Sequence, residues 1–153
     1  MKVVIFAPAV GIIIGLLPAS AFRAISTAGF SLVAAVTAIT LQIMLTGALH
    51  LDGLADTADG FLSYRDKTKI LEIMKDSRIG TNGTLVLIIV LLLKFSGLLT
   101  MRAEHAAFYL LVTPGAGRMT IAWSAGLSSY ARKGNGMGKA MVEKTGRREI
   151  IIS

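Results

Sequence analysis

Three aspartates stand close together in segment 46–61, TGALHLDGLADTADGF. Asp52, Asp56 and Asp59 occupy positions i, i+4 and i+7, which share one face of a helix. Carboxylates packed this closely repel one another, and beside a membrane their desolvation is costly. A cation would offset this cost, and oxygen ligands in a chain without cysteine suit Mg²⁺, which commonly joins carboxylates to substrate phosphates. The spacing therefore predicts a magnesium site that acts on a phosphate or pyrophosphate, and the alternative is a solvated helix end.

Three further polar residues are candidates for catalysis. Asp76 and Arg78 lie in a glycine-punctuated turn, where Asp76 would be a metal ligand or a base and Arg78 would hold a phosphate. An ordinary juxtamembrane turn explains the same pair equally well. Arg118 follows Pro114 within an apolar segment. We therefore expect a broken helix there and a functional arginine at membrane depth, rather than one that marks a span end.

Other polar features have simpler explanations. His50 precedes the aspartates, and a lone histidine at a helix end is more often structural than a metal ligand or a base. Lys94 interrupts an apolar segment, and we interpret it as a side chain that reaches toward the membrane surface. The glycine-rich basic segment 132–139 would cradle a phosphate through backbone N–H groups, although short glycine patterns are weak signals.

The composition indicates an integral membrane protein. Of the 153 residues, 54% are hydrophobic, and the mean hydropathy of +0.68 is far above that of a soluble domain. Four uncharged or nearly uncharged segments are long enough to cross a bilayer: 3–22, 24–49, 79–101 and 106–130. In the first segment, Gly11 and Gly15 have the spacing that lets another helix pack closely. We therefore expect an all-α, polytopic membrane helix bundle of about four spans, forming a single domain over 1–153.

The positive charges orient this bundle in the membrane. The net charge is +7, and one side of the predicted bundle collects twelve Lys and Arg residues against two on the other. By the positive-inside rule the rich side is cytoplasmic, and it also holds the aspartates, the loop after the second segment and the tail. This topology explains the charge without any binding of nucleic acid. Within the loop, 65–76 is expected to form a short amphipathic helix in the headgroup layer.

Three sequence motifs resemble those of the cobalamin synthase family, the adenosylcobinamide-GDP ribazoletransferases. The first is segment 47–60, GALHLDGLADTADG, and the second is 74–83, MKDSRIGTNG. The third is 114–118, PGAGR, followed by YAR at 130–132. Their order and spacing match the family across most of the chain, and the first two motifs are highly specific.

The resemblance implies a magnesium-dependent membrane enzyme late in cobalamin biosynthesis. Such an enzyme joins adenosylcobinamide-GDP to α-ribazole, or to its 5′-phosphate, and releases GMP. By position, the three aspartates of the first motif would hold Mg²⁺ on the pyrophosphate, and Asp76, Arg78 and Arg118 would complete the site. The enzyme would be multi-pass in the inner membrane of a prokaryote with its active site facing the cytoplasm, and a homo-oligomer is left open.

Two differences from the family bear on these expectations. Family members are usually longer, and the last residues, 149–153, resemble the start of another span, so we expect this chain to be incomplete at both ends. The tail carries Lys133, Lys139 and Met141 where proline and bulky apolar residues are usual. One alternative is a CDP-alcohol phosphotransferase, although Asp56 stands where that family has arginine. The other is a small ion-coupled membrane transporter, although the aspartates gather at one span end.

Overall fold

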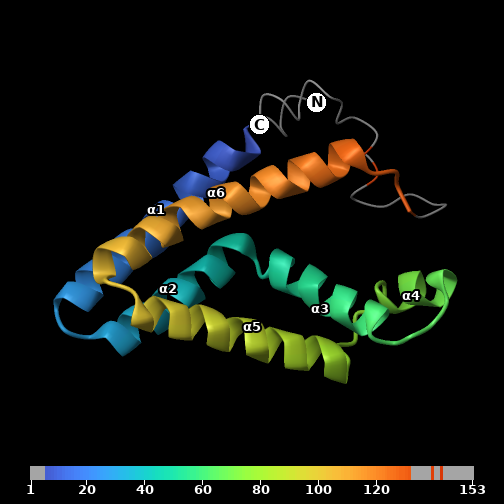
Figure 1. Cartoon of the computed structure of the whole chain (residues 1–153), viewed down its shortest axis with the longest axis horizontal. Helices are drawn as coiled ribbons and strands as arrows, with labels where there is room; N and C mark the ends of the chain where they lie inside the picture. The colour runs from blue at the N-terminus through green and yellow to red at the C-terminus, as the bar shows by residue number, and fades with distance from the viewer. Residues whose placement is uncertain (1–5, 132–138, 140–141, 143–153) are drawn as a thin grey trace.

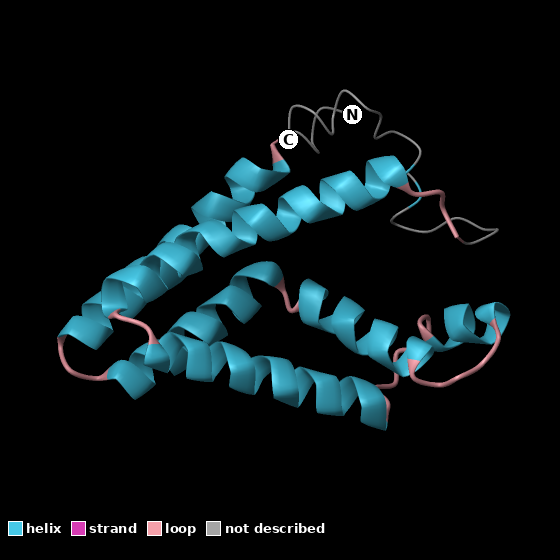
Figure 2. Ribbon diagram, in the orientation of Figure 1, coloured by secondary structure: helices cyan, strands magenta, loops and turns pink. Residues whose placement is uncertain are grey.

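Helices and short turns make up the described part of the chain. A computed structural model describes residues 6–131, Lys139 and Val142 of the 153 residues. Its α-helices follow one another as α1 (Ala7–Thr27), α2 (Ser31–Thr46), α3 (Leu49–Phe61), α4 (Lys67–Ile73), α5 (Thr81–Thr100) and α6 (Ala103–Leu127) (Figure 1, Figure 2). No strand occurs among the described residues, which confirms the predicted all-α class.

The first and last of these helices, α1 and α6, pack side by side in opposite directions (Figure 1). Gly11 and Gly15 of α1 are buried in this contact. A Cβ atom added at Gly15 would meet the backbone carbonyl of Leu111, and one added at Gly11 would meet the backbone of Gly115. The two backbones therefore approach too closely for a larger residue, which confirms the predicted packing role of both glycines.

A sharp break separates α2 from α3. Gly47 follows α2 with a left-handed backbone, φ +57°, and Ala48 comes next with φ +58°. Their N–H groups bond back to the carbonyls of Met44 and Ile43 at 3.2 and 3.0 Å, a pattern typical of helix C-termini. The two helices meet at 87°. Segment 24–49 is therefore not the continuous helix that its lack of charge suggests. Helix α1 runs through Arg23 to Thr27, residues 28–30 form a turn before α2, and glycine at position 47 admits the left-handed turn that ends α2.

Helix α3 packs against α5, and α4 packs against α3 (Figure 1). Asp66 caps α4 by accepting a backbone N–H at 3.0 Å. Ile70 and Met74 lie against Gly60 of α3, where an added Cβ atom would meet both side chains. The amphipathic helix predicted at 65–76 thus exists as α4, seven residues long. The half-buried side chains of Ile70 and Met74 contact α3, and the place of α4 in the headgroup layer stays a prediction.

The tightest core lies where α1, α2 and α6 meet. It is built mainly from alanines around the fully buried Phe22. The other buried members are Ala19, Ala34, Ala35, Ala38, Ala106, Ala107 and Leu110. Such small side chains allow close approach of neighbouring helices, as is usual for helix packing in membranes.

Within the described residues, two helices, α1 and α5, are long and apolar enough to cross a membrane. The bent pair α2–α3 makes a third candidate if it counts as one span. The sequence predicted about four, and the difference is α6, whose 25 residues include enough small and polar ones to dilute its apolar character. Helix α5 buries only Gly83 and exposes five of its large apolar side chains, Leu85, Ile88, Ile89, Leu92 and Leu93, as a helix surrounded by lipid would.

Candidate functional site

The three aspartates lie on α3, as predicted, and the structure gives one of them a defined contact. The Asp59 carboxylate accepts hydrogen bonds from the backbone N–H groups of Gly80, at 2.7 Å, and of Gly83, at 2.8 Å. These groups belong to the start of α5, where the first N–H groups of a helix have no partner within it. Gly80 is the N-cap residue of α5, and glycine has no side chain that could accept hydrogen bonds from these N–H groups. Asp59 therefore caps α5 from another helix, with its negative charge at the positive end of the helix dipole.

Glycine is required at both positions that contact Asp59. A Cβ atom at Gly80 would lie 2.8 Å from Asp59 Cγ, and one at Gly83 would lie 3.0 Å from the same atom. The Gly83 Cβ would also lie 3.0 Å from the backbone carbonyl oxygen of Ala55. A larger residue would displace the carboxylate, so the aspartate segment and the turn at 76–83 form one structural unit joined by Asp59.

The three aspartates do not converge on one point. Among the residues that the structure describes, no group of three or more His, Cys, Asp or Glu side chains is arranged to hold a metal ion. The helix accounts for this, because positions i and i+7 lie about 10 Å apart along its axis. Asp52 is exposed and Asp56 is half-buried, while both oxygens of Asp59 bind the start of α5. A magnesium site made by all three aspartates stays a prediction, and Asp52 with Asp56, one turn apart, is its most compact part.

Asp76 and Arg78 form an ion pair at the surface. Arg78 Nη2 lies 2.6 Å from Asp76 Oδ2, and Arg78 Nε lies 3.0 Å from Oδ1, in the two-bond geometry that arginine makes with carboxylates. The Arg78 backbone N–H adds a third bond to Oδ1 at 3.1 Å. The hydrogen bonds from Arg78 lower the pKa of Asp76 to about 2, so this carboxylate is ionised at neutral pH. The structure thus joins the two residues in one ion pair, and their catalytic role stays a prediction.

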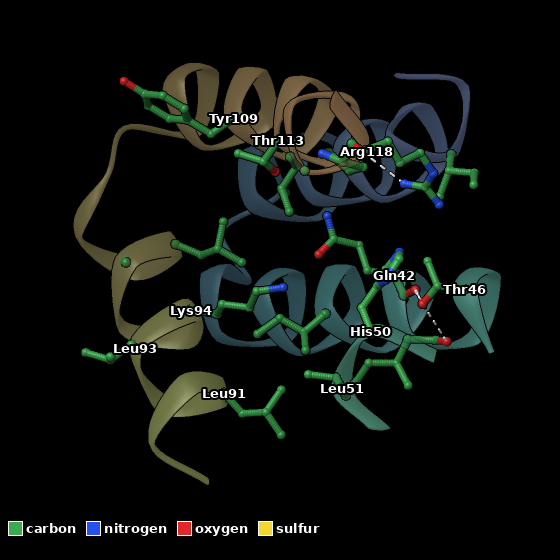
Figure 3. A pocket seen from close by; sticks show the side chains of 18 of the residues that line it. Gln42, Thr46, His50, Leu51, Leu91, Leu93, Lys94, Tyr109, Thr113 and Arg118 are labelled. Carbon is green, nitrogen blue, oxygen red and sulfur yellow. Dashed lines mark hydrogen bonds between the residues drawn. The ribbon is translucent and has the colours of Figure 1, made fainter. Parts of the chain in front are cut away.

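A cavity of about 670 Å³ lies between the helices and is lined by residues of α1, α2, α3, α5 and α6 (Figure 3). Most of its wall is leucine, isoleucine and other apolar side chains. The polar lining residues are Gln42, Thr46, His50, Lys94, Tyr109, Thr113 and Arg118. Its described lining contains no aspartate or glutamate, so the charged groups that face this cavity, Lys94 and Arg118, are both cationic.

Arg118 reaches the cavity from a continuous helix. Helix α6 runs through Pro114 without interruption, so the break predicted at 113–115 is wrong. The close packing of α1 on Gly115 supports α6 beside the proline, as neighbouring helices do in membranes. Arg118 Nη1 donates to the Pro114 carbonyl oxygen at 3.0 Å. Arg118 is therefore a half-buried cation on the cavity wall, and its catalytic role stays a prediction.

Two residues to which the sequence assigns only simple roles, His50 and Lys94, also line this cavity (Figure 3). His50 reaches it because α3 turns away from α2 at 87°. Lys94 comes from α5, which packs against both α2 and α3. A charge within an apolar segment is a signal of function. Lys94 and Arg118 both carry this signal in the sequence, and it is equally strong for the two residues.

Comparison with known families decides among the alternatives that the sequence left open. The family model described as cobalamin-5-phosphate synthase matches residues 1–153. This chain belongs to that family. Its membership confirms the resemblance of the sequence motifs and leaves the CDP-alcohol phosphotransferase and transporter alternatives without support.

Curated relatives within the cobalamin-5-phosphate synthase family carry the name adenosylcobinamide-GDP ribazoletransferase. The protein of Thermoanaerobacter sp. (strain X514) is 40% identical over 152 residues, which cover 99% of this chain and 61% of that protein. The protein of Acetivibrio thermocellus is 42% identical over 150 residues, covering 98% and 60%. That of Fusobacterium nucleatum subsp. nucleatum is 49% identical over 121 residues, covering 77% and 43%. This chain thus spans at most 61% of the length of these relatives, and no solved structure matches it.

The family motifs have different places in the structure. The first and second are joined through Asp59, and Arg118 of the third lines the cavity. The phosphate cradle predicted at 132–139 falls, apart from Lys139, outside the described residues.

Proposed function

We propose that this chain forms part of an adenosylcobinamide-GDP ribazoletransferase in the inner membrane of a prokaryote, with its active site facing the cytoplasm. The observation that carries this proposal is the contact of Asp59 with Gly80 and Gly83, because it unites the two most specific family motifs. The names of the relatives supply the reaction. The substrates would be adenosylcobinamide-GDP and α-ribazole or its 5′-phosphate, and the lipid bilayer would surround the apolar helices.

The donor set on α3 fits Mg²⁺. Asp52 and Asp56 offer carboxylate oxygens one helical turn apart, and Mg²⁺ prefers oxygen ligands. In this proposal these two residues face the pyrophosphate of the substrate, while Asp59 fixes α3 against α5. When bound, Mg²⁺ would neutralise the pyrophosphate and stabilise negative charge on the departing GMP.

Asp76 and Arg78 are suited to positioning rather than to proton transfer. An efficient general base has a pKa near the working pH, whereas Arg78 holds the pKa of Asp76 at about 2. Asp76 is therefore a weak base, and its effect is to orient the Arg78 guanidinium. The Arg78 side chain is 87% exposed, so its remaining N–H groups face outward, where a phosphate of the substrate would bind.

The proposed reaction requires a nucleophile, a leaving group and the loss of one proton. A ribose hydroxyl of α-ribazole attacks the phosphorus atom that is bound to cobinamide. A new P–O bond forms, the P–O bond to GMP breaks, GMP leaves with the electron pair, and the hydroxyl proton passes to water. Cationic side chains beside the transferred phosphoryl group would lower the barrier by stabilising the developing charge.

Release of GMP in membranes tests this proposal. Membranes that contain this chain, or the full-length Acetivibrio thermocellus relative, would receive adenosylcobinamide-GDP and α-ribazole with and without Mg²⁺. We expect GMP and cobalamin only when Mg²⁺ is present. Asp56→Asn should lower kcat/KM by roughly a hundredfold or more, as loss of a charge-stabilising group does. The matched control is Asp66→Asn, because Asp66 caps α4 and should leave kcat/KM nearly unchanged.

Binding of Mn²⁺, followed by electron paramagnetic resonance, gives a readout that does not depend on turnover. Asp56→Asn should weaken this binding and Asp66→Asn should not. Activity of the full-length relative alone would assign catalysis to the longer protein, with this chain as one part of its site. No GMP from either folded protein would refute the proposed function.

A further inference from the structure

The cavity between the helices is a second polar feature, separate from the ion pair and the aspartates. Lys94 enters it from α5 and Arg118 from α6, among apolar neighbours such as Leu91 and Leu98. A positive charge in apolar surroundings is costly unless an anion or a polar group faces it. The hydrogen bond that Arg118 makes is with the neutral carbonyl of Pro114, so its charge is not compensated there. The lining therefore favours a ligand that carries negative charge.

The rest of the cavity restricts the size and shape of that ligand. Pockets of about 300–1,000 Å³ hold drug-sized molecules, and this cavity of about 670 Å³ lies in that range. A nucleoside phosphate is of this size, whereas a corrinoid nucleotide is several times larger and would not enter as a whole. The apolar wall suits a flat aromatic ring, and Gln42, Thr46 and His50 offer hydrogen-bond partners for sugar hydroxyls or a ring nitrogen.

We propose that this cavity receives the ribazole substrate, with its aromatic base against the apolar wall and its ribose phosphate toward Lys94 and Arg118. This inference rests on the proposed function and extends it, because it gives the attacking substrate a site of its own. The start of α3 connects that site to the aspartates. His50 lines the cavity, whereas Asp52, two residues later on the same helix, lies on another face of α3 and outside the lining. A ribose held in the cavity would therefore lie at the start of α3, within a few residues of the proposed metal ligands along this helix.

Two glycines on the cavity wall allow a steric test. A Cβ atom added at Gly97 or at Gly117 meets no atom within 4 Å, and both residues line the cavity. Gly97→Leu on α5 should therefore fill space in the cavity without displacing a helix, and Gly117→Leu does the same independently from α6. The matched control is Ser96→Leu, since Ser96 is an exposed neighbour on α5 and does not belong to the cavity lining.

A second pair of variants tests the charge. Lys94→Met removes the ammonium group and keeps most of the side-chain length. Lys75→Met is the control, because Lys75 is exposed in the turn after α4 and lies outside the cavity lining. Circular dichroism of each variant in nanodiscs verifies the helical fold before binding is measured.

Equilibrium dialysis of radiolabelled α-ribazole 5′-phosphate against the chain in lipid nanodiscs, without adenosylcobinamide-GDP, measures binding apart from turnover. Gly97→Leu and Gly117→Leu should each raise Kd by roughly tenfold or more, while the two controls stay within about twofold. Lys94→Met should raise Kd for the phosphate by roughly tenfold and for unphosphorylated α-ribazole by less.

Three results would overturn this inference. One is an unchanged Kd in both glycine variants, and another is no binding by the unsubstituted chain. In either case GMP release by the full-length relative separates two conclusions. If GMP is released, only the location of the ribazole site is wrong. If none is released, the proposed function is wrong as well. The third is the loss of a bound anionic phospholipid from Lys94→Met, seen by native mass spectrometry, with ribazole binding unchanged. That result would assign the cavity to a lipid headgroup.

Discussion

The Asp59 carboxylate lies against the backbone of Gly83, with Oδ1 2.8 Å from the glycine nitrogen. This hydrogen bond joins residues 24 positions apart in the chain and fixes the end of α3 to the start of α5. An aspartate that the sequence assigns to a metal therefore has a role in the fold. Asp59 should respond to substitution through stability, and Asp52 and Asp56 through activity.

Gly83→Ala should destabilise the contact between α3 and α5. The added methyl group would meet the Asp59 carboxylate and lie 3.0 Å from the Ala55 carbonyl oxygen, so the free energy of unfolding should fall by about 1–3 kcal/mol. The control is Gly97→Ala, where a methyl group meets no atom within 4 Å. There, helix propensity favours alanine by about 1 kcal/mol. Thermal unfolding in detergent micelles measures both, and equal melting temperatures would contradict a tight contact at Gly83.

Asp59→Asn should lower stability more than Asp52→Asn does. Asparagine keeps one oxygen acceptor but loses the charge at the helix N-terminus, which costs about 1–2 kcal/mol. Asp52 is exposed, so its replacement should change the melting temperature little. Faster hydrogen exchange of the Gly83 amide in Asp59→Asn would report the lost cap directly. If Asp52→Asn lowers the melting temperature as much as Asp59→Asn does, Asp59 has no special role in stability.

The stability that the Asp76–Arg78 pair contributes should change with pH only in acid. Arg78 lowers the pKa of Asp76 from its ordinary value of 3.8 to about 2. A lowered folded-state pKa contributes stability that is fully present above the ordinary value and is lost as the pH falls through the folded value. Titration of Asp76 should therefore produce no inflection in stability or activity between about pH 5 and 8.

Carbon-13 NMR of the Asp76 carboxyl group measures this pKa. Arg78→Gln should return it toward its ordinary value, because the hydrogen bonds and charge of Arg78 are the main causes of the shift. Arg65→Gln removes an exposed cation from the turn before α4 and should leave the pKa of Asp76 unchanged. An Asp76 pKa that stays near about 2 in Arg78→Gln would disprove the pairing.

Ala48→Gly should stabilise the bend between α2 and α3. Ala48 has φ +58°, a left-handed conformation that costs a non-glycine residue about 1–2 kcal/mol. Glycine removes this cost but gains freedom in the unfolded chain, so we expect a net gain of roughly 0.5–1 kcal/mol. The control Ala24→Gly, at an exposed position of α1, should destabilise by about 1 kcal/mol. If Ala48→Gly lowers the melting temperature as Ala24→Gly does, the backbone at Ala48 carries no strain.

The features that the sequence predicts correctly depend on nearby residues. The spacing of the aspartates predicts α3, and the uncharged segments predict α1 and α5. The packing of Gly11 and Gly15 is also predictable, because four-residue spacing of glycines leaves a flat stripe on any helix. The Asp76–Arg78 pair follows from the closeness of the two residues in the chain.

The features that the sequence does not predict depend on distant residues. The capping role of Asp59 depends on Gly80 and Gly83, which lie on the other side of α4 in the sequence. The helix at Pro114 stays intact because of packing by α1, which no local pattern reveals. The place of Lys94 on the cavity wall likewise depends on how α5 packs against distant helices.

Because α1 pairs with α6, the most extensive described helix contact joins the first of these helices to leave the ribosome to the last. Gly15 and Leu111 face each other across it, and at about 5–20 residues per second their syntheses are about 5–20 s apart. During that interval α6 has not yet been made, and Gly11 and Gly15 of α1 have no contact with it. Membrane insertion of α1 and closure of the bundle are therefore separate events in the biogenesis of this protein.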